Sequence, residues 1–320
     1  AVSVVLSSDR ATWFFVEWAK VRTPNPSFAR NTLFWEQKNF PQTGDPSADV
    51  KIGLVGSSQT FQGFDIEQLA ASLPTYKFEK NCMAGLGPMQ YPFLIDRIAQ
   101  RNHKIVVCHL SEFDFFRDDS IPISRLRWSA TFSGTIGIAK VLTPAQQFHD
   151  RGNLGDLTMA SITPLWRQRE HYRRTLFGYW WNQSIPAPSE PPQPERLADS
   201  PQLEVAINYL QQNVGHKAMV AANFESFEQF AADLRRRNTQ LIVLEGLVHP
   251  EARAAYDHDA LQLATRQQLA TMATKNAFKY YDQSQLPVFT ANDFADAYHL
   301  NDQGRRKLTD FLTIHLASSN

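Results

Sequence analysis

Cysteine, net charge and long apolar runs are all scarce in this sequence. Only two of its 320 residues are cysteines, Cys82 and Cys108, which is too few for a disulfide framework or a zinc site. Lysine plus arginine (32) equals aspartate plus glutamate (32), so no positive field is present to attract nucleic acid. No apolar run reaches the roughly 18 residues that a membrane-spanning helix needs. We therefore expect no nucleic-acid partner, no metal and no cofactor.

The rest of the composition is that of a folded α/β protein. Hydrophobic residues make up 43 % of the chain and charged residues 20 %, which is typical of globular domains. Short apolar runs predict strands at 50–56, 76–82, 104–110, 241–244 and 278–281. Apolar residues at helical spacing predict helices at 64–73, after the glycine-containing loop at 85–88 up to about residue 100, and at 224–237, 260–275 and 302–316. This alternation predicts a three-layer α/β sandwich with a five-stranded parallel sheet of the flavodoxin type.

The alternation is interrupted after the third predicted strand. We expect residues 50–114 and 216–320 to form the α/β domain, and residues 115–215 to form a helical insertion with a proline-rich linker at 186–194. Residues 1–49 are predicted to be an N-terminal arm that packs on the core. The strands that carry Cys82 and Cys108 are expected to flank a common neighbour, too far apart for a disulfide, so both cysteines are predicted to be buried thiols.

Polar side chains follow every predicted strand, at the edge where an open parallel sheet binds its ligands. Five of them are possible substrate contacts: Gln59, Glu112, Asp114, Glu245 and His249. Each also has a structural interpretation, as a hydrogen-bonded loop side chain or a turn residue before a helix. The spacing of the sequence does not decide between the two.

The most informative residues are Ser58, after the first strand, and Asp296 and His299 near the end of the chain. A serine hydroxyl becomes a nucleophile when an imidazole takes its proton, and the imidazole needs an acceptor that holds its orientation. Asp and His three residues apart in a turn can supply that pair. Asp293 is a weaker alternative to Asp296, and the structural interpretation of the serines is that they cap a helix.

These residues resemble the blocks of the SGNH, or GDSL-like, hydrolases. Gly56-Ser57-Ser58 is similar to the family's Gly-Asp-Ser, and Asp296-Ala-Tyr-His299 matches its Asp-x-x-His. With Phe64-Asp65 following, the likeness is greatest to SGNH-like proteins of cell-envelope acylation, such as the teichoic-acid D-alanylation protein and the exopolysaccharide O-acetylation proteins. The resemblance implies that Ser58 is the nucleophile, His299 the base and Asp296 its orienting carboxylate.

The resemblance also implies an oxyanion hole, and one of its blocks is missing here. Ser58 and Gly85 would donate backbone N–H groups, with Gly87 as an alternative to Gly85. The family's Gly-x-Asn-Asp reads Ser111-Glu112-Phe113-Asp114 in this chain, so Phe113 replaces the oxyanion asparagine. Loss of one such donor costs about 10²–10³ in rate.

The implied function is O-acyltransferase or acyl-esterase chemistry, with acetyl as the expected acyl group. The implied partners are a bacterial envelope or exported polysaccharide, an acyl donor and a membrane acyl-transfer protein. The implied location is extracytoplasmic, periplasmic or at the cell surface, and it allows for a membrane anchor beyond the residues of this sequence. A different class stays open, a non-catalytic carbohydrate-binding or scaffold protein of a polysaccharide export complex, and the loss of the asparagine favours it.

Overall fold

The computed structural model describes residues 42–43, 50–82, 85–116, 121–127, 130–167, 169, 217–255 and 258–318. These residues fall into two compact units. The larger holds the described residues up to 116 and from 217 onward, and the smaller holds those from 121 to 169. The predicted linker at 186–194 and nearly all of the predicted arm lie outside the described residues.

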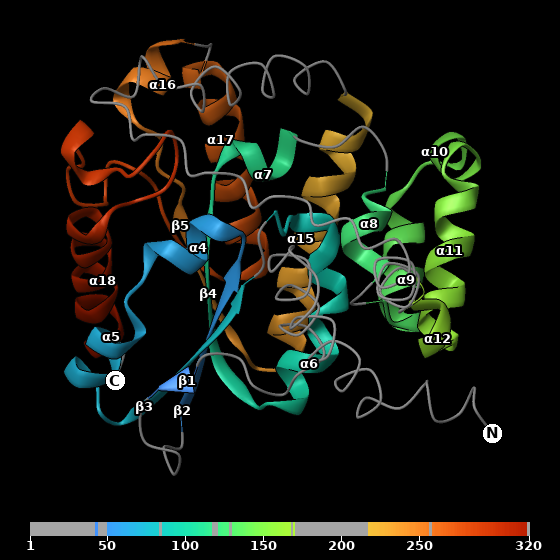
Figure 1. Cartoon of the computed structure of the whole chain (residues 1–320), viewed down its shortest axis with the longest axis horizontal. Coiled ribbons are helices and arrows are strands. Elements are labelled where there is room, and N and C mark those ends of the chain that lie inside the picture. The colour runs from blue at the N-terminus through green and yellow to red at the C-terminus, as the bar shows by residue number, and fades with distance from the viewer. Residues whose placement is uncertain are drawn as a thin grey trace, which may run out of the picture. The chain divides into compact units, whose positions relative to one another are not determined.

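A single sheet forms the centre of the larger unit (Figure 1). Its strands are β1 (Gln42–Thr43), β2 (Val50–Gly56), β3 (Tyr76–Cys82), β4 (His103–Leu110), β5 (Gln240–Glu245) and β6 (Lys279–Tyr281). They lie in the order β1-β3-β2-β4-β5-β6, and all pairs are parallel except β1 with β3. The predicted five-stranded parallel sheet is confirmed. The antiparallel strand β1 was not predicted, because two residues show no periodicity.

Helices cover both faces of this sheet, which makes the three layers of the predicted sandwich (Figure 1). One face carries α4 (Ser58–Gly63), α5 (Ile66–Ser72) and α18 (Asp302–Ala317). The remaining elements of the unit are η1 (Pro88–Phe93), α6 (Ile95–Gln100), α7 (Glu112–Phe116), α15 (Lys217–Arg236), α16 (Pro250–Ala255), α17 (His258–Asn276) and η4 (Ala291–Asp293). Because both faces are covered, the central strands β3, β2, β4 and β5 are buried along most of their length rather than at alternate residues, whereas the edge strand β6 is partly exposed.

Apolar side chains fill the space between the sheet and each helical layer. On the α18 side, Leu54 of β2 and Phe78 of β3 belong to one cluster with Phe64 and Leu312, and all four are fully buried. On the α15 side, aromatic rings pack closely, and the ring centroids of Tyr91 and Phe230 lie 5.0 Å apart. This burial of apolar surface on both faces is the main source of the stability of the sheet.

The segment after β2 differs from its prediction in one respect that matters for the site. The sequence predicts one helix over 64–73, whereas the structure has two short helices, α4 and α5. Asp65 separates them, because its side chain caps α5 by accepting hydrogen bonds from the backbone N–H groups of Glu67 and Gln68, both at 3.1 Å. The added helix α4 begins at Ser58.

Both cysteines of the larger unit are buried free thiols. Their strands, β3 and β4, flank β2 as predicted. Burial raises the pKa of the Cys82 thiol to about 12, and it raises that of Cys108 as well. Neither cysteine therefore supplies a thiolate at neutral pH.

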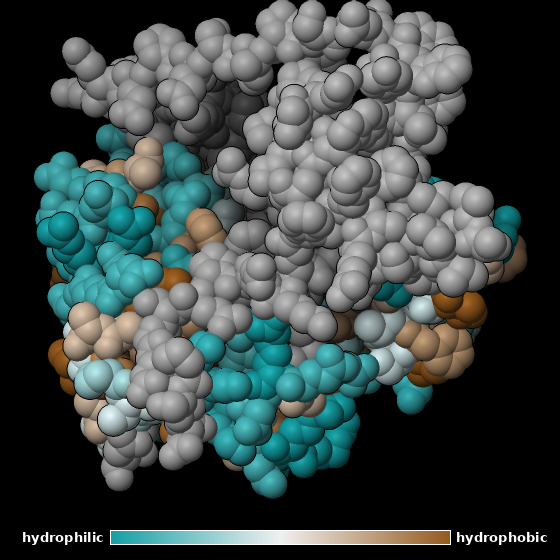
Figure 2. Space-filling model, turned by 60° about the horizontal axis from the view of Figure 1, so that its bottom comes forward, coloured by the Kyte–Doolittle hydropathy of each residue, from teal (hydrophilic) through white to brown (hydrophobic). Residues whose placement is uncertain are grey.

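The smaller unit consists of helices in its described part. They are α8 (Ile123–Leu126), α9 (Phe132–Val141), α10 (Pro144–His149), α11 (Arg151–Ile162) and α12 (Pro164–Arg167). Large apolar side chains reach its surface, with Phe148 70 % and Ile162 63 % exposed. Figure 2 shows brown and tan side chains at the right-hand edge, where these helices lie in Figure 1. No helix in the described part of the chain has the length and hydropathy to cross a membrane.

Candidate active site

The candidate site is built on α4 and on the loop that precedes α18. Ser57 and Ser58 follow β2, and the two serines have different contacts. The Ser57 side chain caps α4, since its Oγ accepts from the backbone N–H of Gln59 at 3.4 Å. Ser58 is the first residue of the helix, and its hydroxyl does not take part in this cap. The capping interpretation therefore applies to Ser57 and not to Ser58.

The Ser58 hydroxyl lies within hydrogen-bond distance of an imidazole that is 241 residues away in sequence. Ser58 Oγ lies 2.8 Å from His299 Nε2, and His299 Nδ1 lies 2.7 Å from Asp296 Oδ2. The other carboxylate oxygen, Oδ1, accepts from the backbone N–H groups of Tyr298 at 3.0 Å and His299 at 2.9 Å. Asp296 is thus oriented by its own turn. The three residues form the serine–histidine–aspartate relay expected of an acyl-transfer nucleophile.

The electrostatics of Asp296 determine the tautomer of the imidazole. Burial opposes ionisation of this carboxyl, but its hydrogen bond and charge interaction with His299 and the two backbone amides outweigh burial, and the pKa of Asp296 is lowered. An ionised Asp296 accepts a hydrogen bond from the Nδ1–H group of His299, which keeps the imidazole proton on Nδ1 and leaves Nε2 as an acceptor. Nε2 is then able to take the proton of the Ser58 hydroxyl.

Asp293, the alternative to Asp296, is engaged elsewhere. Its Oδ2 accepts from Lys307 Nζ at 2.8 Å and from the backbone N–H of Thr290 at 2.7 Å. The side chain is fully buried, and Gly304 of α18 packs against its backbone carbonyl. Asp293 therefore holds the loop to α18, and Asp296 is the carboxylate that bonds to the His299 imidazole.

The loop after β3 offers Gly85 and Gly87 as oxyanion donors. The N–H of Gly87 donates to Gln90 Oε1 at 2.5 Å, as part of the turn that starts η1. Gly85 has a φ of 73°, in the left-handed region that favours glycine. It follows β3 by three residues, and the last residue of β3, Cys82, pairs with Gly56 at the end of β2. The Gly87 amide is thus used within the loop. That Gly85 is an oxyanion donor stays a prediction.

Phe113, where the resembled family has asparagine, offers a ring instead of a donor. Its centroid lies 5.7 Å from that of Tyr298, which in turn lies 4.5 Å from the His299 ring. Both side chains are partly buried against a small cluster that includes Val248 and Ala297. The α7 segment therefore contributes an aromatic contact beside the base rather than an oxyanion amide.

The five predicted substrate contacts divide into two groups. Gln59, Glu112 and Asp114 are at most 5 % exposed, and Asp114 Oδ2 accepts from the backbone N–H of Ser111 at 2.9 Å. His249 is 6 % exposed; its Nδ1 accepts from the backbone N–H of Glu251 at 3.1 Å, and burial lowers the pKa of its imidazole. Gln59, Asp114 and His249 therefore bond to the protein itself, and Glu112 is buried.

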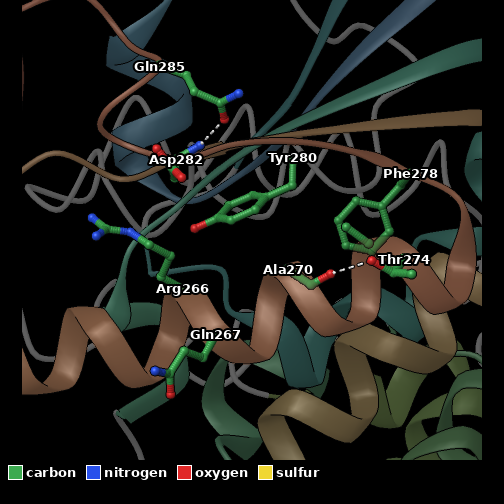
Figure 3. Close-up of a pocket in the computed structure, with 9 residues that line it drawn as sticks. Arg266, Gln267, Ala270, Thr274, Phe278, Tyr280, Asp282 and Gln285 are labelled. Carbon is green, nitrogen blue, oxygen red and sulfur yellow. Dashed lines mark hydrogen bonds between the residues drawn. The ribbon is translucent and has the colours of Figure 1, made fainter.

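Glu245 lies at the end of β5, and its carboxylate is directed toward α17. It accepts two hydrogen bonds from Arg266, at 2.9 and 3.0 Å, and others from the Gln283 backbone at 2.8 Å and the Tyr280 hydroxyl at 3.3 Å. Arg266 and Tyr280 line an open groove of about 590 Å³ between α17 and β6, and Figure 3 shows the Tyr280 hydroxyl pointing toward Arg266. No residue of the relay lines this groove.

A structural role for Glu245 leads to a prediction. We expect Glu245→Gln to lower the free energy of unfolding by about 2 kcal/mol, because it removes the charge of a buried carboxylate that accepts from the partly exposed Arg266. Urea unfolding measures this loss. The KM for any ester substrate should stay within about 2-fold of the parent value, and a large rise in KM with unchanged stability would instead make Glu245 a substrate contact.

Sequence reasoning gave no role to two residues that the structure places beside the relay, Ser111 and Tyr298. In the sequence, Ser111 is only a polar residue after a strand, and Tyr298 is only an unspecified position of Asp-x-x-His.

Within the described ranges, no three His, Cys, Asp or Glu side chains group as a metal site requires. No protein-family model matches this sequence, and no curated protein matches it either.

Proposed function

We propose that this protein carries out serine-dependent acyl-ester chemistry through an acyl-Ser58 intermediate. The observation that carries the proposal is the continuous relay from Ser58 through His299 to Asp296, with spacings of 2.8 and 2.7 Å. A hydroxyl, an imidazole with a free acceptor nitrogen and an oriented carboxylate are the groups that activate a serine for attack on a carbonyl.

Each half-reaction moves one proton through His299. As Ser58 Oγ attacks the acyl carbonyl, Nε2 takes the hydroxyl proton and Asp296 stabilises the imidazolium. The proton then passes to the departing alkoxide, and the acyl group stays on Ser58 as an ester. In the second half, Nε2 takes a proton from water or a sugar hydroxyl, whose oxygen attacks the acyl-enzyme. The imidazolium then returns this proton to Ser58 Oγ as the acyl–Oγ bond breaks. Esterase and transferase differ only in that acceptor.

The resemblance to envelope-acylation proteins supports a narrower form of this proposal. The acyl group is acetyl, the acceptor or donor is a glycan of the cell envelope or an exported polysaccharide, and the protein works outside the cytoplasm with a membrane acyl-transfer partner. A non-catalytic glycan-binding role is the alternative, supported by the replacement of the oxyanion asparagine by Phe113. It predicts glycan binding that survives Ser58→Ala.

Acetyl trapping on Ser58 tests the proposal. After brief incubation with an aryl acetate and acid quenching, we expect peptide mass spectrometry to find one acetyl group on Ser58. Ser57→Ala is the matched control: it removes the helix cap, at a cost of about 1 kcal/mol, and should keep the label on Ser58. Ser58→Ala should lose the label. No label in the folded parent, or a label that stays in Ser58→Ala, would contradict the proposal.

A further inference from the structure

Gln59, the residue after the candidate nucleophile, is buried and uses both ends of its side-chain amide. It is 5 % exposed. Its Oε1 accepts from the Ser111 hydroxyl at 2.9 Å. Its Nε2 donates to the backbone carbonyl of Tyr298 at 3.1 Å and reaches that of Leu247 at 3.5 Å. One side chain thus bonds to three separate segments.

These three segments are the loops that form the carboxyl edge of the sheet around the relay. Ser111 follows β4, Leu247 follows β5, and Tyr298 lies in the loop before α18. Gln59 is adjacent to Ser58 in sequence, and Tyr298 is adjacent to His299. The amide therefore joins the segment of the nucleophile to the segment of the base, one residue away from each reacting group.

The partners of Gln59 are themselves held in place. The backbone N–H of Ser111 donates to Asp114 Oδ2 at 2.9 Å. Gly246 packs so closely on Ser111 that an added Cβ would lie 2.4 Å from the Ser111 Cβ, and its N–H donates to the Leu110 carbonyl at 2.6 Å. The loops after β4 and β5 are thus one packed support, and Gln59 connects this support to the His299 loop.

The amide is the chemical group that this position requires. Two carbonyl oxygens face one end and need a donor, while a hydroxyl at the other end needs an acceptor. A glutamate would place a carboxylate oxygen against the two carbonyls. An apolar residue would remove the donor that both carbonyls face, and would leave the Ser111 hydroxyl with Asp114 Oδ2, at 3.3 Å, as its acceptor.

We propose that Gln59 is a positioning residue that holds His299 against Ser58. The inference rests on the proposed acyl chemistry for its kinetic consequence, and on the hydrogen bonds alone for its structural one. Gln59 does not touch the reacting atoms. It acts through the backbone of the His299 loop, and a displacement of about 1 Å there can cost up to about 10²-fold in rate.

The kinetic test compares variants that change the hydrogen-bonding groups of the side chain at position 59. With an aryl acetate, Gln59→Ala and Gln59→Glu should lower kcat by about 10- to 100-fold and keep KM within about 2-fold. Gln62→Ala, in the same helix and half-buried, is the matched control and should keep both constants. Thermal unfolding of each variant checks that the fold is intact. In the His299→Ala background, Gln59→Ala should cause no further loss, because its effect passes through His299.

Losses that multiply in the double variant, or a Gln59→Glu enzyme as active as the parent, would overturn the inference. A second measurement does not depend on turnover. In protein labelled with ¹⁵N-histidine, Ser58→Ala should shift the Nε2 resonance of His299 because it removes the hydrogen bond. In the Gln59→Ala background that shift should be much smaller.

An equal shift in both backgrounds would show that Gln59 does not hold the pair, and would also overturn the inference. If the parent shows no turnover and yet the two shifts differ as expected, the proposed function fails while the positioning role of Gln59 stands. The two proposals can therefore fail separately.

Discussion

Ser58→Ala, His299→Ala and Asp296→Asn are each expected to lower kcat for an aryl acetate by about 10⁴-fold, with little change in KM. The first two remove the nucleophile and the base. Asp296→Asn acts through the tautomer: an asparagine that donates its N–H₂ to Nδ1 moves the imidazole proton to Nε2. Nε2 then donates to Ser58 Oγ at the position where it should accept, and the hydroxyl loses its base.

Steady-state kinetics of single and double variants check this expectation. Because the three residues act as one unit, a double variant should be about as slow as the slowest single one. Asp293→Asn is the matched control, since it lies on the same loop but pairs with Lys307. It should lower the melting temperature and keep kcat. If Asp293→Asn is the variant that loses kcat, the assignment of the orienting carboxylate is wrong.

The stability of the protein is expected to fall between about pH 6.5 and pH 4, by roughly 3 kcal/mol from one histidine. His109 of β4 is 1 % exposed, and burial lowers the pKa of its imidazole to about 4, whereas an unfolded histidine has a pKa of about 6.5. Hydrogen bonds with the backbone of Gln59 and Glu245 oppose this lowering but do not outweigh burial, and the ring packs edge-on against Phe64.

The sign follows from proton binding. Between these two pKa values the unfolded chain binds a proton at His109 and the folded chain does not, so acid favours unfolding. Each unit of pKa difference is worth about 1.4 kcal/mol. The full penalty is reached near pH 4, and above about pH 6.5 it disappears.

Denaturant unfolding at a series of pH values measures this effect, and His109→Met is the variant to compare. It keeps a similar volume under Gly63 of α4, whose added Cβ would lie 3.3 Å from His109 Nδ1. The slope of unfolding free energy with pH should flatten in the variant. His249, whose pKa is also lowered by burial, contributes to the slope in the same direction, and so, toward pH 4, do carboxyls of lowered pKa such as Asp296. An unchanged slope would refute the role of His109.

Much of the fold could be predicted from local pattern. β2 and β3 have the predicted bounds, and β4, β5 and β6 are within one residue of them, because buried parallel strands are short apolar runs bounded by turn residues. The pairing of Asp296 with His299 was also predictable, since the two residues are three apart and bond within one turn. The strand β1 and the helix α4 were missed, because both are too short to show a period.

The sequence by itself determined where the strands of the parallel sheet lie along the chain and which residue types stand at its carboxyl edge. Only the tertiary structure decided which of those residues act together. Ser58 and His299 are 241 residues apart, Gln59 and Tyr298 are 239 apart, and Glu245 finds Arg266 rather than the relay. A hydrogen bond depends on distances of about 3 Å and on direction, and no spacing along a chain encodes these until the sheet and its helices bring the segments together.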